Sequence, residues 1–289
     1  MTEQELERQR ATLWHIDGAP IRTVEEARGF IEAVGLAVTY PERAFPLVPS
    51  FIGAYVGSAA GLPDFRHAFA DPRAQGATEL MVRLLRERHA FELGLAGDID
   101  LIVSAQMFPY FYALVGDRNP KAPAKVKAQG AAVSELAARV FESLQKTGPM
   151  TKTQLQTAVG REASLPALDR ALLELWSILK ITRVDYHPGE GASWDVLYRW
   201  APDAVKEGLN ISVPEAVSAL VSKYLEGVVA AEQEEIEQLL SLLTSRSKVR
   251  DAVNALLAAR ELSFVTVGLK TLIHMTPPPE PQQRRRIHG

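Results

Sequence analysis

The order of helical and strand patterns in the second half of the chain constrains the fold more than any other feature. Residues 125–203 predict three helices and then two strands around a Gly-rich turn, and residues 204–276 predict the same order again. Sliding one copy along the other places Leu173 on Leu256 and Leu179 on Leu262. Two tandem copies of one small unit explain this pattern better than one irregular domain does.

Local signals place the helix ends of the first copy. Gly148 and Pro149 end one helix, and Thr151 is an N-cap for a short helix that follows. Ser164 then caps a longer helix with an apolar stripe that we expect to be buried: Leu165, Leu168, Leu172, Leu175, Trp176 and Leu179. The break lets the short helix cross the first, so that the third can lie across both, as in a winged helix.

The first segment is less regular. Thr23 and Glu26 predict a capping box at the start of a helix, and residues 78–95 predict a strong amphipathic helix. An apolar run at 98–116 fits neither a strand nor a helix cleanly. We therefore expect a mainly α-helical protein with small β-hairpin wings, organised as an N-terminal mostly helical segment at 1–124, winged helices at 125–203 and 204–276, and a disordered basic tail at 277–289.

Composition limits the possible classes. The chain has no cysteine, which excludes disulfides and thiolate chemistry, and it has no apolar run of the roughly 18 residues that span a bilayer. We expect a cytoplasmic protein without a membrane segment. The net charge is −3, but residues 125–200 and the tail from Pro277 each carry +2. Polyanion affinity depends on such local cations more than on the total charge.

A winged helix commonly places its third helix in the major groove of DNA and its wing beside the backbone. Polar residues at those positions are candidate contacts to double-stranded DNA: Lys152, Gln154, Arg161, Ser164, Arg170, Arg183 and His187 in the first copy, and Arg246, Lys248, Arg250 and Lys270 in the second. Acidic residues such as Asp169 and Asp185 interrupt this set. The alternative is a winged helix with a solvated, charged surface that contacts protein.

Other candidate sites are weaker. The six histidines are scattered without ligand spacing, and no Gly-rich phosphate-binding motif occurs, so we expect neither a metal nor a cofactor. Arg83 and Arg86 share a helix face that could bind phosphates, although a solvated face is more typical. The aromatic residues of 107–112 could stack on a nucleobase, but such a cluster inside an apolar run is more often core.

The pattern from GPMTKTQL through LDRALLELWSILKITRV to DVLYRWAPDAV resembles the AlkZ/YcaQ-like winged-helix family. The resemblance implies tandem winged helices and kinship with DNA glycosylases that excise alkylated or crosslinked bases. It covers residues 131–275, and it extends to the N-terminal segment only through EEARGFIEAVGLAVTYPER.

Active members carry a Gln followed two positions later by Gln or Asp, which positions the attacking water. Val38 and Tyr40 occupy those positions here, and neither can accept the proton of a water molecule at neutral pH. The catalytic residues are therefore unknown, and Asp17, Asp64 and Asp100 are candidates for a displaced carboxylate.

Three functions remain open: a DNA-binding relative of the glycosylases without the usual catalytic pair, an active glycosylase that uses a displaced carboxylate, and a winged-helix scaffold for protein interactions. The oligomeric state is not determined by the sequence.

Overall fold

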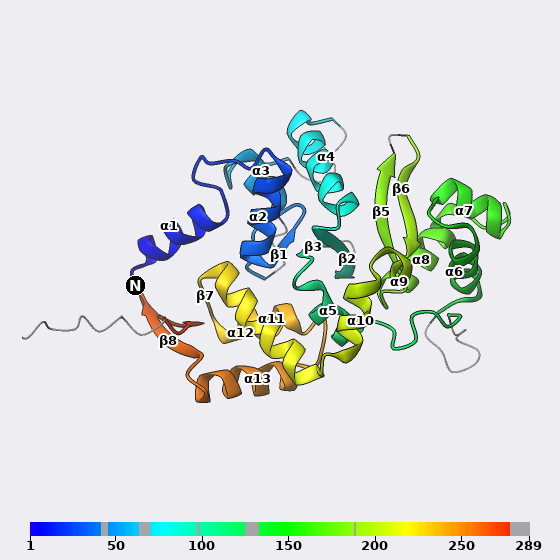
Figure 1. Ribbon diagram of the computed structural model, residues 1–289. Coiled ribbons are helices and arrows are strands. Elements are labelled where there is room, and N and C mark those ends of the chain that lie inside the picture. The colour runs from blue at the N-terminus through cyan, green and yellow to red at the C-terminus, as the bar shows by residue number, and fades with distance from the viewer. Residues whose placement is uncertain (42–45, 64–69, 97–98, 125–132, 188, 278–289) are drawn as a thin grey trace, which may run out of the picture.

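The computed structural model describes residues 1–41, 46–63, 70–96, 99–124, 133–187 and 189–277 (Figure 1). Three units with the same order of elements make up most of it. The first unit, residues 24–104, contains α2 (Val24–Val34), β1 (Leu36–Val38), α3 (Phe51–Val56), α4 (Pro72–Arg86), β2 (Ala90–Ala96) and β3 (Ile99–Ser104).

The other two units repeat this order of helix, short strand, two helices and hairpin. The second, residues 135–196, contains α6 (Glu135–Thr147), β4 (Met150–Thr151), α7 (Lys152–Val159), α8 (Leu165–Trp176), β5 (Ile181–His187) and β6 (Gly191–Val196). The third, residues 213–275, contains α11 (Val213–Val228), β7 (Ala230–Ala231), α12 (Gln233–Leu240), α13 (Arg246–Ala258), β8 (Leu262–Val267) and β9 (Lys270–Met275).

The three sheets also share one strand order. Each sheet is antiparallel, with the second hairpin strand in the centre: β1-β3-β2, β4-β6-β5 and β7-β9-β8. The short strand after the first helix therefore closes the free edge of each hairpin. The first segment, for which we expected mostly helix, thus contains a third copy of the arrangement seen in the other two.

The register expected between the last two copies is wrong. Helix α8 begins at Leu165 and helix α13 begins at Arg246, so the residue equivalent to Leu256 is Leu175 and not Leu173. Leu175 and Leu256 are both buried, whereas Leu173 is 42% exposed. Leu165 is also exposed, at 46%, because the first turn of α8 projects beyond the core that buries the rest of the stripe.

The expected helix at 78–95 is the other error. Helix α4 begins at Pro72 and ends at Arg86, where the backbone turns through Arg88 with a φ of 60° before β2 begins at Ala90. Arg88 therefore does not continue the helix, and its guanidinium carbon lies over the Trp200 ring, 4.6 Å from the centroid. The alternation of apolar residues in β2 is the strand signal that the helical pattern of α4 obscured.

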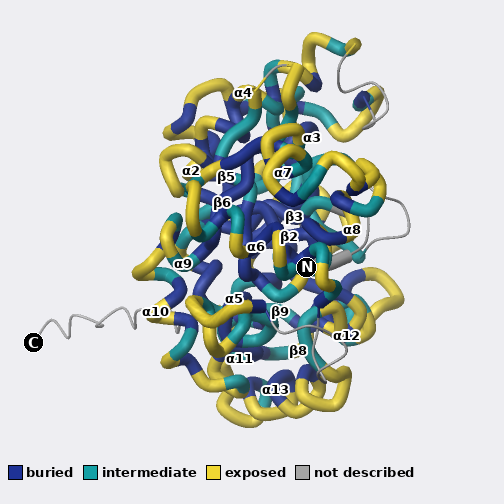
Figure 2. Tube along the Cα trace, turned by 90° about the vertical axis from the view of Figure 1, so that its right-hand side faces the viewer, coloured by how far each residue is buried: buried dark blue, intermediate teal, exposed yellow. Residues whose placement is uncertain are grey.

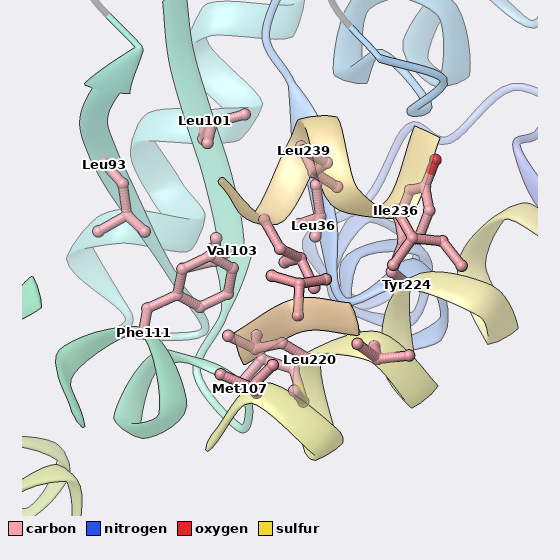
Figure 3. Close-up of a cluster of buried hydrophobic side chains, with 14 of the residues drawn as sticks. Leu36, Leu93, Leu101, Val103, Met107, Phe111, Leu220, Tyr224, Ile236 and Leu239 are labelled. Carbon is pink, nitrogen blue, oxygen red and sulfur yellow. The ribbon is translucent and has the colours of Figure 1, made fainter. Parts of the chain in front are cut away.

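The first and third units share one hydrophobic core. Helix α5 (Phe108–Val115) follows the first unit along the chain, α9 (Leu197–Trp200) and α10 (Pro202–Asn210) follow the second, and α1 (Glu3–Leu13) lies at the N-terminus. Figure 3 shows Leu36 and Val103 of the first sheet beside Phe111 of α5 and Leu220 and Tyr224 of α11. Burying these side chains together removes apolar surface of two units and a linking helix from water at once.

The aromatic cluster at 107–112 belongs to this core. Phe108, Phe111 and Tyr112 are each no more than 2% exposed, and Phe108 stacks on Phe91 with ring centroids 4.1 Å apart. The prediction of a core role is confirmed. The second unit has its own core around α6 and α8, and Figure 2 shows buried chain running through all units with exposed residues outside.

Capping residues predicted from the sequence are present. The Thr23 hydroxyl accepts a hydrogen bond from the Glu26 amide, and the Glu26 carboxylate accepts one from the Thr23 amide. Thr151 caps α7, and Ser164 caps α8. Within the described ranges, no helix combines the length and the hydropathy needed to cross a membrane. All of the predicted disordered tail except Pro277 lies outside the described residues.

Candidate functional site

A cleft of about 900 Å³ opens between α4 of the first unit and the β5–β6 hairpin of the second. Figure 1 shows these elements standing side by side, with the end of β1 and the strands β2 and β3 below them. The polar and charged lining comes from these elements and the segment after β1: Thr39, Tyr40, Gln75, Thr78, Glu79, Arg83, Arg86, Glu92, Asp100, Arg183, Asp185 and Tyr186. Its volume falls in the range of small-molecule sites in proteins.

Three charged side chains from three strands meet in this cleft. The Arg183 Nη1 atom lies 3.0 Å from Asp100 Oδ2 and 3.5 Å from Glu92 Oε2. The Glu92 side chain is only 4% exposed, whereas that of Asp100 is 35% exposed. The Arg183 guanidinium therefore contacts both a buried carboxyl group and a water-accessible carboxylate.

Burial sets the titration of Glu92. Removal from water raises the pKa of Glu92 to about 7, which the charge of Arg183 only partly opposes, and the charge of Asp100 adds to the rise. Burial alone would lower the pKa of Arg183, but the two carboxylates outweigh it and raise that pKa. Arg183 thus stays charged, and Glu92 is the group that changes its charge near neutral pH.

Aromatic packing holds Arg183 in place. Its guanidinium carbon lies 4.4 Å from the centroid of Trp176 and 5.2 Å from that of Trp194, and these two rings meet edge to face. A register shift in β5 between Arg183 and Asp185 marks a β-bulge, a feature that often re-aims side chains beside functional sites. Trp176 is fixed in turn because its Nε1 donates to the Glu92 carbonyl at 3.2 Å.

An exposed ion pair crosses between the walls of the cleft. The Arg86 guanidinium of α4 lies 2.5 Å from Asp185 Oδ1 of β5. His187 is exposed near the hairpin turn, with its Nε2 3.7 Å from Asp185 Oδ2. Tyr40, after β1, and Tyr186 of β5 add aromatic surface. The lining therefore combines aromatic rings with three arginines and four carboxyl groups.

Most of the predicted DNA-contacting residues already have partners within the protein. Lys152 pairs with Asp169 at 2.9 Å, and Lys270 pairs with Glu232 at 2.5 Å. The remaining members of this group are Gln154, which accepts from the Thr151 amide, Ser164, which caps α8, and Arg250, which makes two hydrogen bonds to Glu237. Arg183 is the only one of the eleven that lines the cleft.

Four predicted contacts remain exposed without an ion pair or side-chain hydrogen bond to any other described residue: Arg161, Arg170, Arg246 and Lys248. Arg83 of α4 shares this property and also lines the cleft. We expected a solvated face for Arg83 and Arg86, and the structure places both at the cleft. Whether any of these cations contacts DNA stays a prediction.

The three aspartates predicted as candidates for a displaced catalytic carboxylate lie in different places. Asp100 lies in the cleft, Asp17 is exposed outside it and accepts a hydrogen bond from the Thr12 hydroxyl, and Asp64 lies outside the described residues. Val38 is buried in β1, and Tyr40 lines the cleft. Of the two positions to which the resemblance assigns the catalytic pair, Tyr40 therefore lines the cleft and Val38 belongs to the hydrophobic core. No cluster of three or more metal-binding side chains occurs in the described part of the chain.

Sequence reasoning missed Glu92 because it assigned that residue to a helix surface. An acidic residue inside the alternating run AFELGLA was the available signal. The contact between Glu92 and Arg183, which lies 91 positions later in the chain, cannot be predicted from neighbouring residues.

The chain is similar to known proteins in both sequence and fold. A family model described as DNA glycosylase AlkZ-like matches residues 70–287. Among solved structures, the DNA glycosylase AlkZ of Streptomyces sahachiroi matches with a TM-score of 0.60 and 14% sequence identity, over 96% of this chain and 70% of that chain. An identity this low establishes the fold alone. A search of curated proteins found no match.

Proposed function

The chain belongs to the AlkZ-like DNA glycosylase family, and from this premise we propose that it binds double-stranded DNA through three winged helices. The shared element order and strand order of the three units support the winged-helix assignment. Each unit has a third helix, α4, α8 or α13, which in this reading faces DNA. The family's catalytic pair would fall on Val38 and Tyr40, so binding does not depend on the usual catalytic residues.

One observation carries this proposal. The third helix of every unit bears an exposed arginine without an ion-pair partner among the described residues: Arg83 on α4, Arg170 on α8 and Arg246 on α13. Unpaired guanidiniums can contact phosphates without first breaking an internal ion pair. Each unit therefore offers one such cation on its third helix, at a different position along it, while the carboxyl groups of the cleft repel phosphates from its floor.

The test is duplex binding measured by fluorescence anisotropy at several salt concentrations. We expect affinity at low salt that falls steeply as salt rises, because phosphate contacts release counterions. Changing Arg83, Arg170 and Arg246 one at a time to Gln should each weaken binding and reduce the log–log salt slope by roughly one.

Arg28→Gln is the matched control. Arg28 is an exposed helical arginine of the first unit that pairs with Glu32 at 2.7 Å, so its loss should leave binding unchanged. A wild-type protein without measurable duplex affinity at low salt would exclude the proposed function.

A further inference from the structure

The outer strand of the third sheet has a free edge. In each sheet the first strand of the hairpin lies on the outside, as β2, β5 or β8. Strands β2 and β5 lie against each other where the first and second units pack. Strand β8 pairs with β9 on one side, and no other strand of the described residues pairs with its second side. Figure 1 shows β8 at the rim of the molecule, near the start of α1. A free edge presents unpaired N–H and C=O groups that can continue a sheet into another chain.

Strand β8 lacks the features that usually prevent edge pairing. It reads LSFVTV, without a charge, a proline or a glycine, and its pairing with β9 has no register shift. By contrast, β2 and β5 each have a register shift, and β5 also carries Arg183, Asp185 and His187. Phe264, in the middle of β8, is 62% exposed. Because bulges and charges are the common protection of an edge, β8 is the outer strand of the three that is open to pairing.

The backbone pattern shows which groups of β8 point to the free edge. The Thr276 amide donates to the Glu261 carbonyl at 2.9 Å, so the backbone groups of Glu261 point toward the β9 side. These groups alternate in direction along a strand, and those of Leu262, Phe264 and Thr266 therefore point outward. Two copies of such an edge can pair antiparallel about a two-fold axis, because each outward N–H then meets an outward C=O.

Charges at the two ends of β8 are complementary between two copies. With Phe264 of one copy opposite Phe264 of the other, Glu261 lies opposite Val267 of the second copy, and Val267 pairs in turn with Lys270. Glu261 and Lys270 of different copies then lie in one row on one face of the joint sheet, with opposite charges. The Lys270 side chain is 69% exposed, so its ammonium group can contact a second carboxylate besides that of Glu232.

Neighbouring registers fit less well. With the two-fold axis at Val265, Arg260 of one copy would lie opposite Lys270 of the other, and these like charges repel. With the axis at Ser263, the last two residues of β8 would lie beyond the partner strand. The charges and the strand length therefore favour the axis at Phe264.

We propose that this protein forms a two-fold symmetric dimer in which the β8 strands of two copies pair antiparallel, with Phe264 opposite Phe264. The two third-unit sheets then form one sheet of six strands. Each exposed Phe264 ring covers the other, which removes apolar surface of both from water. The dimer goes beyond the proposed DNA binding and does not depend on it.

Sedimentation equilibrium of the full chain over a range of protein concentrations tests the dimer. The wild type should shift from monomer to dimer as concentration rises. Phe264→Lys should raise the dissociation constant by about tenfold or more, because burial of the two rings is lost and two ammonium groups face each other. Leu269→Lys is the matched control. Leu269 is fully exposed in the turn of the same hairpin, outside the paired stretch, so this variant should keep the wild-type constant. Circular dichroism checks that each variant is folded.

Cross-linking tests the register, because the chain has no cysteine of its own. In the dimer, the Cβ atoms at position 264 of the two copies lie about 5 Å apart. Those at position 269 lie roughly 30 Å apart, since about ten positions of extended chain separate them. A short bismaleimide should therefore cross-link the Phe264→Cys variant into dimers and leave the Leu269→Cys variant uncross-linked.

Three outcomes would overturn the proposal. A wild-type protein that stays monomeric at every concentration would mean that the edge is free or is covered by another segment or another protein. A dimer that Phe264→Lys leaves intact would place the interface elsewhere. Equal cross-linking at positions 264 and 269 would contradict the antiparallel pairing at Phe264.

Discussion

Glu92 illustrates at the residue scale how burial shifts the titration of a carboxyl group. Its pKa is raised to about 7 because its carboxyl is removed from water, against an ordinary value of 4.5. Between these two pH values the folded protein therefore holds a proton that the unfolded chain has lost. The free energy of unfolding must then fall as the pH rises through this window, and the penalty is complete above about pH 7.

Glu92→Gln tests this sign. The variant has no charge to bury, so its free energy of unfolding relative to that of wild type should rise between pH 4.5 and pH 8, by about 3 kcal/mol for the full pKa difference. Urea unfolding at the two pH values measures the change. Glu79→Gln removes an exposed carboxylate of the same cleft and should show no such rise. An unchanged difference for Glu92→Gln would show that Arg183 keeps Glu92 ionised throughout.

At the scale of single elements, helix ends are fixed by side chains close in sequence. The reciprocal Thr23 and Glu26 hydrogen bonds at the start of α2 recur in α1, α7 and α11, where Thr or Ser is followed three residues later by Glu or Gln. Each box satisfies amide groups that the first turn leaves without partners. These starts need no tertiary contact to be specified.

Thr23→Ala should therefore destabilise α2 by about 1 kcal/mol, the usual cost of losing an N-cap. Amide hydrogen exchange at Glu26 should accelerate, and the midpoint of thermal unfolding should fall. Thr153→Ala changes an exposed threonine inside α7 without a cap role and serves as the control. Equal behaviour of the two variants would mean that packing alone positions the start of α2.

At the scale of the whole molecule, the cleft depends on how the first and second units pack. Gly94 of β2 faces Trp176 of α8 so closely that a Cβ at this position would lie 2.4 Å from the Trp176 ring atom Cε3. The same tryptophan donates to the Glu92 carbonyl and packs against Arg183. One close contact thus sets both the interface and the floor of the cleft.

Gly94→Ala should displace the Trp176 ring and cost about 1–3 kcal/mol, as overpacking does in well-packed interiors. Thermal unfolding measures the loss, and quenching of tryptophan fluorescence reports the exposed ring. Gly29→Ala is the matched control, because Gly29 lies in α2 with no neighbour within 4 Å and alanine favours helix there. That control should be slightly more stable than wild type, and a similar gain for Gly94→Ala would contradict the close packing.

The sequence by itself determined the features that depend on neighbouring residues. It predicted the caps at Thr23, Thr151 and Ser164, the apolar stripes of the helices and the hairpins of the last two units. These features could be predicted because their hydrogen bonds and periodic burial involve residues only a few positions apart. The core role of the aromatic residues at 107–112 could be predicted for the same reason.

Tertiary structure alone decided the third copy of the unit and the composition of the cleft. The first unit escaped recognition because long connections separate its helices and because the end of α4 runs directly into β2 without a Gly or Pro stop. Glu92, Asp100 and Arg183 meet only because two units pack through Trp176. Burial and charge pairing between distant strands arise from packing, and no local pattern records them.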